Sequence, residues 1–387
     1  MKKFYSLKLL IVFNFIIITL SSCFDDKVNV VTTYYGEGED KILRKHLNLP
    51  GFPYNYSFQL PRHTGLFAAP VNPDLATLGR VLFYDKNLSK DKTISCASCH
   101  KQELAFSDNV AFSEGVESRA TARNSIALGS VLNFSAYYGG FNGIPFFWDN
   151  RAQTVQDQSR ATLGNPVEMD MKMHEVADVV NDLEYYEPLI QKAYNTKGKI
   201  TETQILDAIG EFVNSLTNYN TKFDRELDKV GLNKINSDFS GFSASENRGK
   251  SIYIKNCASC HGENAARPPV ISANNGLMSQ YDDMGVGKHT NKSSDESIFK
   301  VPTLRNVSRT APYMHNGMFK TLSDVIDHYS TGIVMHKNLS SQLRSNFQTS
   351  KKFNFTQQEK EDLIAFFMTF NDEKITSDDK FSDPFLR

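Results

Sequence analysis

The 387-residue sequence predicts a mostly helical protein with two domains and long functional loops. Apolar residues recur at helical spacing in several segments, whereas patterns in which apolar and polar residues alternate, as in strands, are few. The pentapeptide Cys-Ala-Ser-Cys-His occurs twice, at 96–100 and at 257–261. Between the copies, residues 229–245 are rich in Asn, Ser, Asp and Gly, a composition typical of a domain boundary. We therefore expect two helical domains, 63–238 and 239–387.

Three helices are predicted most clearly. Leucines and valines recur at helical spacing over 73–84. Two further segments, 201–216 and 356–370, open with Thr-x-x-Gln and Thr-x-x-Glu, the pattern of a capping box, and continue with an apolar face. Helices are thus expected in both domains.

The first 22 residues have the pattern of a secretory signal peptide, with lysines at the start, an apolar stretch over 9–20 and small residues before Cys23. Leu-Ser-Ser-Cys resembles the end of a bacterial lipoprotein signal, in which the cysteine is lipidated and becomes the mature N-terminus. A plain signal peptide with an incidental Cys23 is the alternative. We expect a lipid-anchored protein on the periplasmic side of a bacterial membrane, with the cell surface as a second location. Residues 23–62 are expected to form a linker and an N-terminal arm.

The charge balance argues against a nucleic-acid-binding protein. Lys and Arg together number 43, Asp and Glu number 44, and no long basic run occurs. The composition, 40% hydrophobic and 22% charged, is that of a globular protein. Apolar stretches beyond the N-terminus are too short to span a bilayer.

The two pentapeptides predict two covalently attached c-type haems, because C-x-x-C-H is the attachment signature of this cofactor. Two thiols two residues apart can each form a thioether with one vinyl group of the porphyrin, and the adjacent imidazole can then bind the iron. A zinc site or a dithiol redox motif is the alternative for a single pair, and an exported chain could also form disulfides. Two identical copies that use every cysteine except Cys23 favour haem. The predicted attachment residues are Cys96, Cys99 and His100 for the first haem and Cys257, Cys260 and His261 for the second.

Two haems in one chain indicate electron movement. The residues alone leave two classes open: an electron carrier, or an enzyme that brings electrons through one haem to chemistry at the other. The sixth ligand of each iron decides between them, because an open iron can bind a substrate whereas a filled one only passes electrons.

Several stretches between residues 70 and 372 resemble the bacterial di-haem cytochrome c peroxidase family, including its relative that matures the tryptophan-derived quinone of methylamine dehydrogenase. The matching stretches are 78–85, 123–125, 147–151, 165–169, 301–306 and 311–317. The resemblance implies two cytochrome c-like helical domains. It also implies that the first haem performs the chemistry and the second delivers electrons.

The resemblance assigns the central chemistry to three residues at ten-residue intervals, Trp148, Gln158 and Glu168. Trp148, the single tryptophan of the chain, matches the residue that bridges the haems. Glu168 matches a proton shuttle, because a carboxylate beside an open iron can act as general acid and base. Gln158 matches a residue that orients peroxide through its amide. Taken alone, Trp148 could be a core residue and Glu168 a solvated surface charge.

The loop after the first haem predicts an open iron. Many peroxidases of this family carry a His in this loop, and it leaves the iron only when the second haem is reduced. Here residues 107–123 contain no His, and the next one is His174. We therefore expect the first haem to be high-spin at rest and to need no reductive activation.

The sixth ligand of the second haem is predicted to be Tyr329. Ordinary family members have Met at this position, whereas the quinone-maturing relative has Tyr. Tyr329 also shares a helical face with Leu322 and Val325, so a core position is the alternative. The other candidate ligands are His328, Met318 and Met335.

A calcium ion between the haems is a further implication of the resemblance. Asn124 would supply a side-chain oxygen and Thr310 and Pro312 main-chain carbonyls, and oxygen ligands suit this hard cation. The alternative for Asn124 is a turn cap. His315 matches a family position without an assigned role. The other histidines are expected to be structural or solvent-facing; they are His46, His63, His174, His289 and His336.

The leading functional hypothesis is reduction of hydrogen peroxide to water, with electrons from a small cytochrome c or a cupredoxin entering at the second haem. Oxidation of a protein or organic substrate through high-valent haem is the second hypothesis, favoured by the missing loop His and by Tyr329. A pure electron-transfer cytochrome is the third, and it would have no use for Glu168. Family members are often dimers, so a homodimer is also considered.

Overall fold

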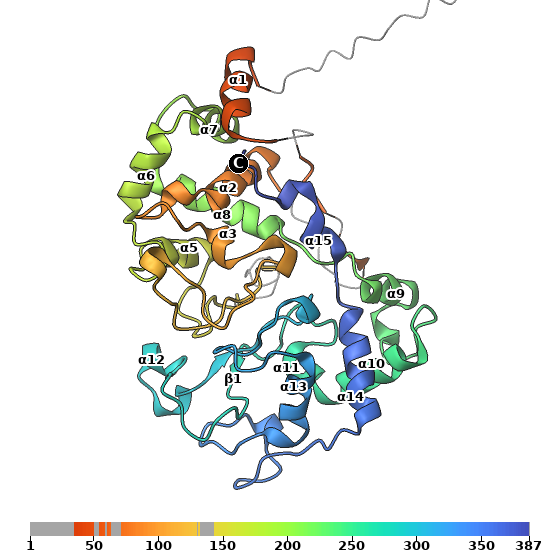
Figure 1. Ribbon diagram of the computed structural model, residues 1–387. Coiled ribbons are helices and arrows are strands. Elements are labelled where there is room, and N and C mark those ends of the chain that lie inside the picture. The colour runs from red at the N-terminus through yellow and green to blue at the C-terminus, as the bar shows by residue number, and fades with distance from the viewer. Residues whose placement is uncertain are drawn as a thin grey trace, which may run out of the picture.

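The computed structural model describes residues 35–49, 54–58, 60–62, 71–129, 131 and 143–386. The predicted signal peptide, the lipidation site Cys23 and His63 lie outside these ranges. Helices connected by long loops dominate, as predicted (Figure 1). Within the described residues, no helix is both long and apolar enough to cross a membrane.

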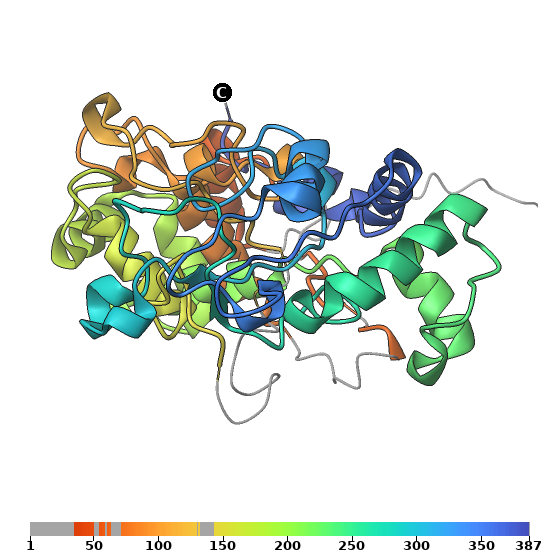
Figure 2. The same ribbon diagram turned by 90° about the horizontal axis from the view of Figure 1, so that it is seen from below.

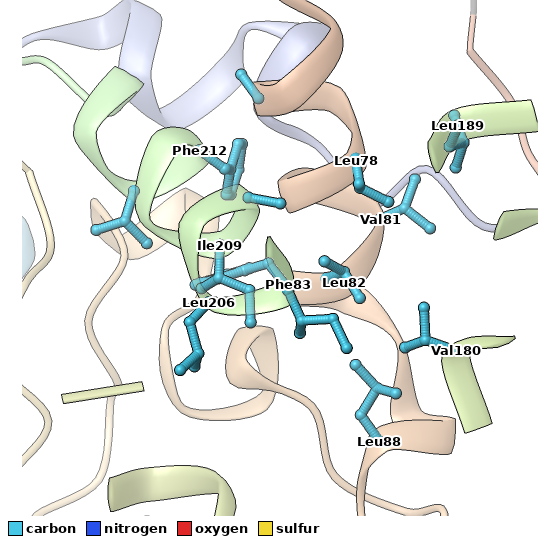
Figure 3. Close-up of a cluster of buried hydrophobic side chains, with 14 of the residues drawn as sticks. Leu78, Val81, Leu82, Phe83, Leu88, Val180, Leu189, Leu206, Ile209 and Phe212 are labelled. Atoms are coloured by element: carbon cyan, nitrogen blue, oxygen red, sulfur yellow. The ribbon is translucent and has the colours of Figure 1, made fainter. Parts of the chain in front are cut away.

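The first domain is built on the packing of two helices across a glycine. Helix α2 begins at Pro73 behind the cap Asn72, and α8 begins behind the predicted cap Thr201, with its capping box formed. Where they cross, a Cβ on Gly79 would lie 1.8 Å from the Ala208 carbonyl oxygen, so only glycine allows this approach. Apolar side chains from both helices, among them Phe83 and Phe212, fill the core of this domain (Figure 3). Cys96 and Ala97 of the first pentapeptide pack against this core. The helices of this domain are α1 (Glu37–His46), α2 (Pro73–Tyr84), α3 (Cys96–Cys99), α5 (Val155–Leu163), α6 (Met173–Asp182), α7 (Tyr186–Tyr194) and α8 (Glu202–Ser215).

The second domain repeats this arrangement. Helix α10 precedes the second pentapeptide and packs on α14, and a Cβ on Gly249 would lie 1.9 Å from the Asp362 carbonyl oxygen. The expected capping box at Thr356 and Glu359 opens α14. The remaining helices are α9 (Lys222–Val230), α10 (Ala244–Asn256), α11 (Ala258–His261), α12 (Gly287–Thr290), α13 (Leu322–Asp327), α14 (Gln357–Met368), α15 (Glu373–Ser377) and the π-helical turn His328–Gly332.

Strand structure is minimal, as expected. Strand β1 (Ser272–Ala273) pairs antiparallel with β2 (Phe299–Lys300), with Ser272 opposite Lys300 and Ala273 opposite Phe299. Short 3₁₀ turns complete the described structure: Lys86–Leu88, Gln102–Leu104, Val116–Ser118, Leu232–Lys234, Ser293–Asp295, Val307–Arg309, Ser341–Leu343 and Asp379–Phe381. The functional segments therefore lie largely in loops held by the two helical cores.

The chain crosses between the domains at two places that differ from the predicted boundary after residue 238. Helix α9 packs in the second core, where Asp224 accepts a 2.6 Å bond from the buried Arg305. The C-terminal segment returns to the first domain, where Ile375 and Phe381 join its core and Arg80 donates to the Ser382 carbonyl (Figure 1, Figure 2). The second core therefore contains residues from before the predicted boundary, and the first core contains residues from the C-terminus. These crossings hold the two domains together.

Candidate haem sites and the wall between them

The first pentapeptide forms a single helical turn that presents its thiols and imidazole together. Cys96 and Cys99 lie on α3, and His100 is its C-cap. The Nδ1 atom of His100 lies 2.9 Å from the Phe106 carbonyl oxygen. A carbonyl only accepts, so Nδ1 donates and Nε2 is left with its lone pair for a metal. Burial lowers the pKa of His100, which keeps the imidazole neutral, as an iron ligand must be.

The second pentapeptide has the same design. Cys257 ends α10, and Cys260 and His261 lie on α11. The His261 Nδ1 atom lies 3.0 Å from the Pro302 carbonyl oxygen, and burial lowers the pKa of His261 to about 4. The two imidazoles are therefore oriented by carbonyls from different loops, one local and one distant.

The thiols fit haem attachment better than a zinc site. All four described cysteines are free, and burial raises the pKa of Cys96 and of Cys257 to about 12. A structural zinc site takes four ligands, whereas each pentapeptide supplies two thiols and one imidazole. Within the described residues, no group of three or more His, Cys, Asp and Glu is arranged to hold a metal ion. Paired neutral thiols beside one neutral imidazole are suited to covalent attachment of a porphyrin.

Each pentapeptide faces its own cavity. The first cavity, of about 920 Å³, is lined by Cys96, Cys99 and His100. The second, of about 210 Å³, is lined by Cys257, Cys260 and His261 together with a largely apolar wall. The residues present thus fit one haem in each domain.

One short wall separates the two cavities. The residues that line both are Asn124, Ser125, Ile126, Ala127, Trp148 and Lys300. The Trp148 indole N–H donates to the Asn124 carbonyl at 2.8 Å, and the Trp148 carbonyl accepts the Lys300 main-chain N–H at 2.7 Å. Bonds to both domains therefore place the tryptophan in the wall between the cavities.

The structure brings Gln158 and Glu168 together in the wall of the first cavity. Burial raises the pKa of Glu168, although hydrogen bonds from Thr162 and Asn165 and the charge of Arg151 oppose this shift. The Asn165 amide donates to Glu168 Oε1 at 2.6 Å, and Gln158 Nε2 donates to Thr162 Oγ1 at 3.0 Å. A carboxyl whose pKa is raised towards neutrality can both accept and return a proton.

The loop at 107–123 packs directly on the Glu168 turn. The Val116 N–H donates to the Glu168 carbonyl at 2.9 Å. At Gly115 a Cβ would lie 1.8 Å from the Val167 carbonyl oxygen, so the contact requires glycine. The absence of a His from this loop could be read from the sequence, whereas the close approach at Gly115 could not.

Tyr329 lines the second cavity from the π-helical turn. Burial raises its pKa to about 12, so the phenol is neutral without a metal. His328 is turned away, with Nε2 3.0 Å from the Asn275 carbonyl, and Met318 is exposed. Met335 does not line the cavity, but Met314, which was not among the predicted ligands, does. Tyr329 therefore remains the predicted ligand, with Met314 as a new competitor.

The three predicted calcium residues converge on the second cavity, which Asn124, Thr310 and Pro312 all line. The Asn124 amide donates to the Val110 carbonyl at 3.1 Å, so it bonds to a distant segment rather than capping its own turn. Its Oδ1 atom is then oriented away from that bond. The calcium site stays a prediction based on neutral oxygen atoms.

An ion network across the domain interface was not anticipated. Arg123 contacts Asp283 through two bonds of 2.7 and 2.8 Å and Asp149 at 2.6 Å. Asp149 also bonds to Arg151 and, at 2.9 Å, to His289. Burial alone would raise the pKa of Asp149, but Arg123 and His289 lower it to about 2. This network includes Asp149, the residue after Trp148, and joins the two domains beside the first cavity.

Comparison with known proteins agrees with this architecture. Residues 73–230 match the family model described as di-haem cytochrome c peroxidase, and residues 246–371 match the cytochrome c model. The chain is 32% identical over 274 residues to a cytochrome c551 peroxidase of Nitrosomonas europaea, covering 67% of this chain and 73% of that protein. The chain belongs to the di-haem cytochrome c peroxidase and MauG family.

Other members of the family match over similar lengths. The methylamine utilization protein MauG of Methylorubrum extorquens is 29% identical over 315 residues, covering 79% of this chain and 80% of that protein. A solved MauG-like protein associated with microbial copper homeostasis superposes with a TM-score of 0.67 at 29% identity, covering 81% of this chain and 94% of that one. The diheme peroxidase BthA of Burkholderia thailandensis, at 19% identity and a TM-score of 0.60, shares the fold over 82% of this chain and 91% of that one. The two cytochrome c domains of the chain are thus those of a di-haem family member.

The remaining histidines lie either in structural contacts or at the surface. His46 bonds to Glu184 at 2.7 Å, and His174 is exposed. His336 is buried and accepts the Asn338 N–H at 3.1 Å. The His315 ring stacks on Phe299 with a centroid distance of 3.7 Å, in the wall of the second cavity.

Proposed function

We propose that the chain is a cytochrome c peroxidase that reduces hydrogen peroxide to water at the first haem. The observation that carries the proposal is the pair Gln158 and Glu168 in the wall of the first cavity, with the Glu168 pKa raised by burial. An electron carrier has no need for a buried carboxyl at its haem, whereas cleavage of an O–O bond requires a proton to move between the two oxygens. The family relationship to a cytochrome c551 peroxidase supports the same reaction.

The protein's own groups would manage the protons. Ionised Glu168 accepts a proton from bound peroxide and returns it to the departing oxygen, so that two electrons and two further protons complete two waters. The Asn165 amide occupies Glu168 Oε1 as a donor, so the transferred proton is carried on Oε2. Gln158 orients the peroxide through its amide. The bound haem supplies the electron pair that breaks the O–O bond.

Electrons would enter at the second haem from a small cytochrome c or a cupredoxin and reach the first through Trp148. The position of Trp148 in the wall shared by the cavities supports this route. A calcium ion held by Asn124, Thr310 and Pro312 would stiffen the same wall. A lipid anchor at Cys23 would keep the enzyme on the periplasmic side of a membrane or, as the second location, on the cell surface, and a homodimer is an assembly to be tested. These partners stay part of the proposal.

A second candidate function is oxidation of a protein or organic substrate. Two observations favour it: Tyr329 lines the second cavity, and the chain is 29% identical to MauG of Methylorubrum extorquens. A phenolate on the second iron would lower its potential, which favours oxidised states of the pair. The two enzymes would share the first step with peroxide and differ in what is oxidised afterwards.

The test is a stopped-flow spectrum of the fully oxidised protein mixed with hydrogen peroxide. We expect a high-spin signal that disappears on mixing without prior reduction, and a Glu168→Gln variant that reacts at least about a hundredfold more slowly. Turnover with a reduced cytochrome c or cupredoxin then identifies the peroxidase, whereas turnover only with an organic or protein substrate identifies the second candidate. A low-spin spectrum that peroxide does not change, even after half-reduction, would exclude both.

A further inference from the structure

Lys300 is the one charged side chain among the six described residues that line both cavities. The residue is buried, with 4% of its surface exposed. Its Nζ atom donates to the Pro145 carbonyl at 2.6 Å, and its main-chain N–H donates to the Trp148 carbonyl at 2.7 Å. One residue of the second domain therefore contacts the segment 145–148 of the first domain at two points.

The short strand β2 fixes the main chain of Lys300. Lys300 lies opposite Ser272 in the pairing with β1, and the next residue, Val301, donates to the Ile271 carbonyl at 2.9 Å. The preceding residue, Phe299, is buried. The main chain on both sides of Lys300 is thus held in the second domain, while the ammonium is bonded to the first.

A haem in either cavity favours the charged form of Lys300. Burial lowers the pKa of Lys300 to about 7. Each c-type haem carries two propionate carboxylates, and negative charge close to an ammonium opposes such a shift. We therefore expect Lys300 to be a cation in the holoprotein, held in the wall between the two haems by its bond to the Pro145 carbonyl.

A fixed cation beside a haem favours the ferrous state, because reduction removes one positive charge from the iron. At an effective dielectric constant of about 20, a unit charge about 10 Å away changes such an equilibrium by roughly tenfold. Lys300 lines both cavities, so it acts on both haems. Tyr329, in contrast, lines the second cavity only, and a phenolate there would lower the potential of that haem alone.

We propose that Lys300 is a shared cation that raises the reduction potentials of both haems together. Lys300 sets the common level of the two potentials, whereas the axial ligands of each iron set the difference between them. A common rise favours electrons on the haem pair, so that two of them are at hand for a substrate in the first cavity. This consequence for turnover rests on the proposed function, but the potentials themselves require only the two bound haems.

The experiment measures the reduction potential of each haem in the holoprotein by spectroelectrochemical titration, at about pH 6, where the ammonium is charged. Three substitutions separate charge from packing. Lys300→Met removes the charge at similar length, Lys300→Gln keeps an N–H donor without the charge, and Lys300→Arg keeps the charge. Lys288→Met is the matched control, because Lys288 is exposed and lines the first cavity but not the second.

The charge-removing variants should shift both haems. In Lys300→Met and Lys300→Gln, we expect the ratio of ferrous to ferric iron at a fixed potential to fall by about tenfold for each haem, which is about 59 mV for a one-electron couple. Lys300→Arg should keep both ratios within about twofold of the wild type, because the cation is retained. Lys288→Met should leave the second haem unchanged and shift the first by less than about threefold, because an exposed charge is screened.

The pattern across the variants decides the inference. A shift confined to one haem in Lys300→Met, or no shift at all, would overturn it. Wild-type potentials in Lys300→Gln would assign the effect to the hydrogen bond and not to the charge, and a Lys300→Arg variant no closer to the wild type than Lys300→Met would assign Lys300 a merely structural role. If Lys300→Met does not take up both haems, Lys300→Gln replaces it in the same comparison. A wild-type protein that does not react with peroxide would remove the proposed function, while the potentials would still decide the role of Lys300.

Discussion

The main-chain N–H of Val116 donates a 2.9 Å hydrogen bond to the main-chain carbonyl of Glu168. This bond joins the loop after the first haem to the turn that carries the predicted proton shuttle. Gly115 makes the approach feasible, because a Cβ there would lie 1.8 Å from the Val167 carbonyl oxygen. The loop is therefore a fixed wall of the first cavity that holds Glu168 in place.

Gly115→Ala should displace the Glu168 turn. Because the clash is with main chain, which cannot move aside like a flexible side chain, we expect a loss of roughly 1–3 kcal/mol in the free energy of unfolding and a peroxide reaction at least tenfold slower. Stopped-flow mixing and denaturant unfolding measure the two effects. Gly164→Ala is the matched control, since its Cβ would only make an ordinary 3.5 Å contact. Equal rates in the two variants would show that the loop does not position Glu168.

Trp148→Phe should slow electron transfer between the haems while leaving the first reaction with peroxide nearly intact. The variant removes the indole and its bond to the Asn124 carbonyl. When fully reduced protein is mixed with peroxide, we expect oxidation of the second haem to slow by about tenfold or more. The free energy of unfolding should fall by about 1–3 kcal/mol, because the Asn124 carbonyl loses its donor. Phe146→Leu, at another aromatic residue lining the first cavity, is the control. Unaltered oxidation of the second haem in Trp148→Phe would assign the electrons another route.

Tyr329→Phe should change the visible and EPR spectra of the second haem and raise its reduction potential, because a phenolate ligand favours the ferric state. Tyr313→Phe is the matched control: Tyr313 lines the same cavity, but its hydroxyl donates to the Val307 carbonyl at 2.9 Å. If Tyr329→Phe keeps the wild-type spectra and Met314→Leu does not, the ligand is Met314.

Asp149→Asn should weaken the domain interface. Asp149 is 3% exposed and bonds to Arg123, Arg151 and His289. Removal of its charge weakens these bonds while Arg123 keeps its pair with Asp283, so the change should cost roughly 1–3 kcal/mol. The pKa of the Asp149 carboxyl in the folded protein, about 2, lies below its ordinary value of 3.8. The contribution of the Asp149 charge to the free energy of unfolding is therefore present above the unfolded pKa and is lost as the pH falls towards 2.

Unfolding measured against pH checks this sign. The wild type should lose stability relative to Asp149→Asn between about pH 4 and pH 2. Asp40→Asn is the control, because Asp40 pairs with Arg44 on an exposed face of α1, where such pairs contribute at most about 0.5 kcal/mol. An Asp149→Asn variant as stable as this control would show that the network does not hold the domains together.

Much of the fold could be predicted because its signals are local. The caps Thr201 and Thr356 and the apolar faces behind them lie within single helices, and the structure has those helices where they were expected. The domain boundary could not be predicted in the same way, since α9 and the C-terminal segment each join a core through distant contacts such as that between Arg80 and Ser382.

The residues of the candidate site also divide into those that the sequence indicates and those that only tertiary contacts reveal. The resemblance pointed to Trp148, Gln158 and Glu168, which the structure places around the first cavity. Thr162, Asn165 and Gly115 were missed because Thr, Asn and Gly are common in loops and helix ends and have no chemical signature of their own. The one signal in the sequence was Gly115, a glycine in a loop without a turn pattern. Such a glycine indicates a close main-chain contact, but it does not indicate which segment is contacted.

The sequence by itself determined the covalent chemistry of this protein. Two thiols and an imidazole within five consecutive residues need only one helical turn to face one porphyrin, so each haem site is a local property. Only the tertiary structure decided which residues surround the haems. Arg123 and Asp283, 160 residues apart, meet because two separate cores pack against each other, and the same packing places Trp148 in the wall between the cavities. Such contacts depend on the relative position of whole helices and loops, which no short stretch of sequence specifies.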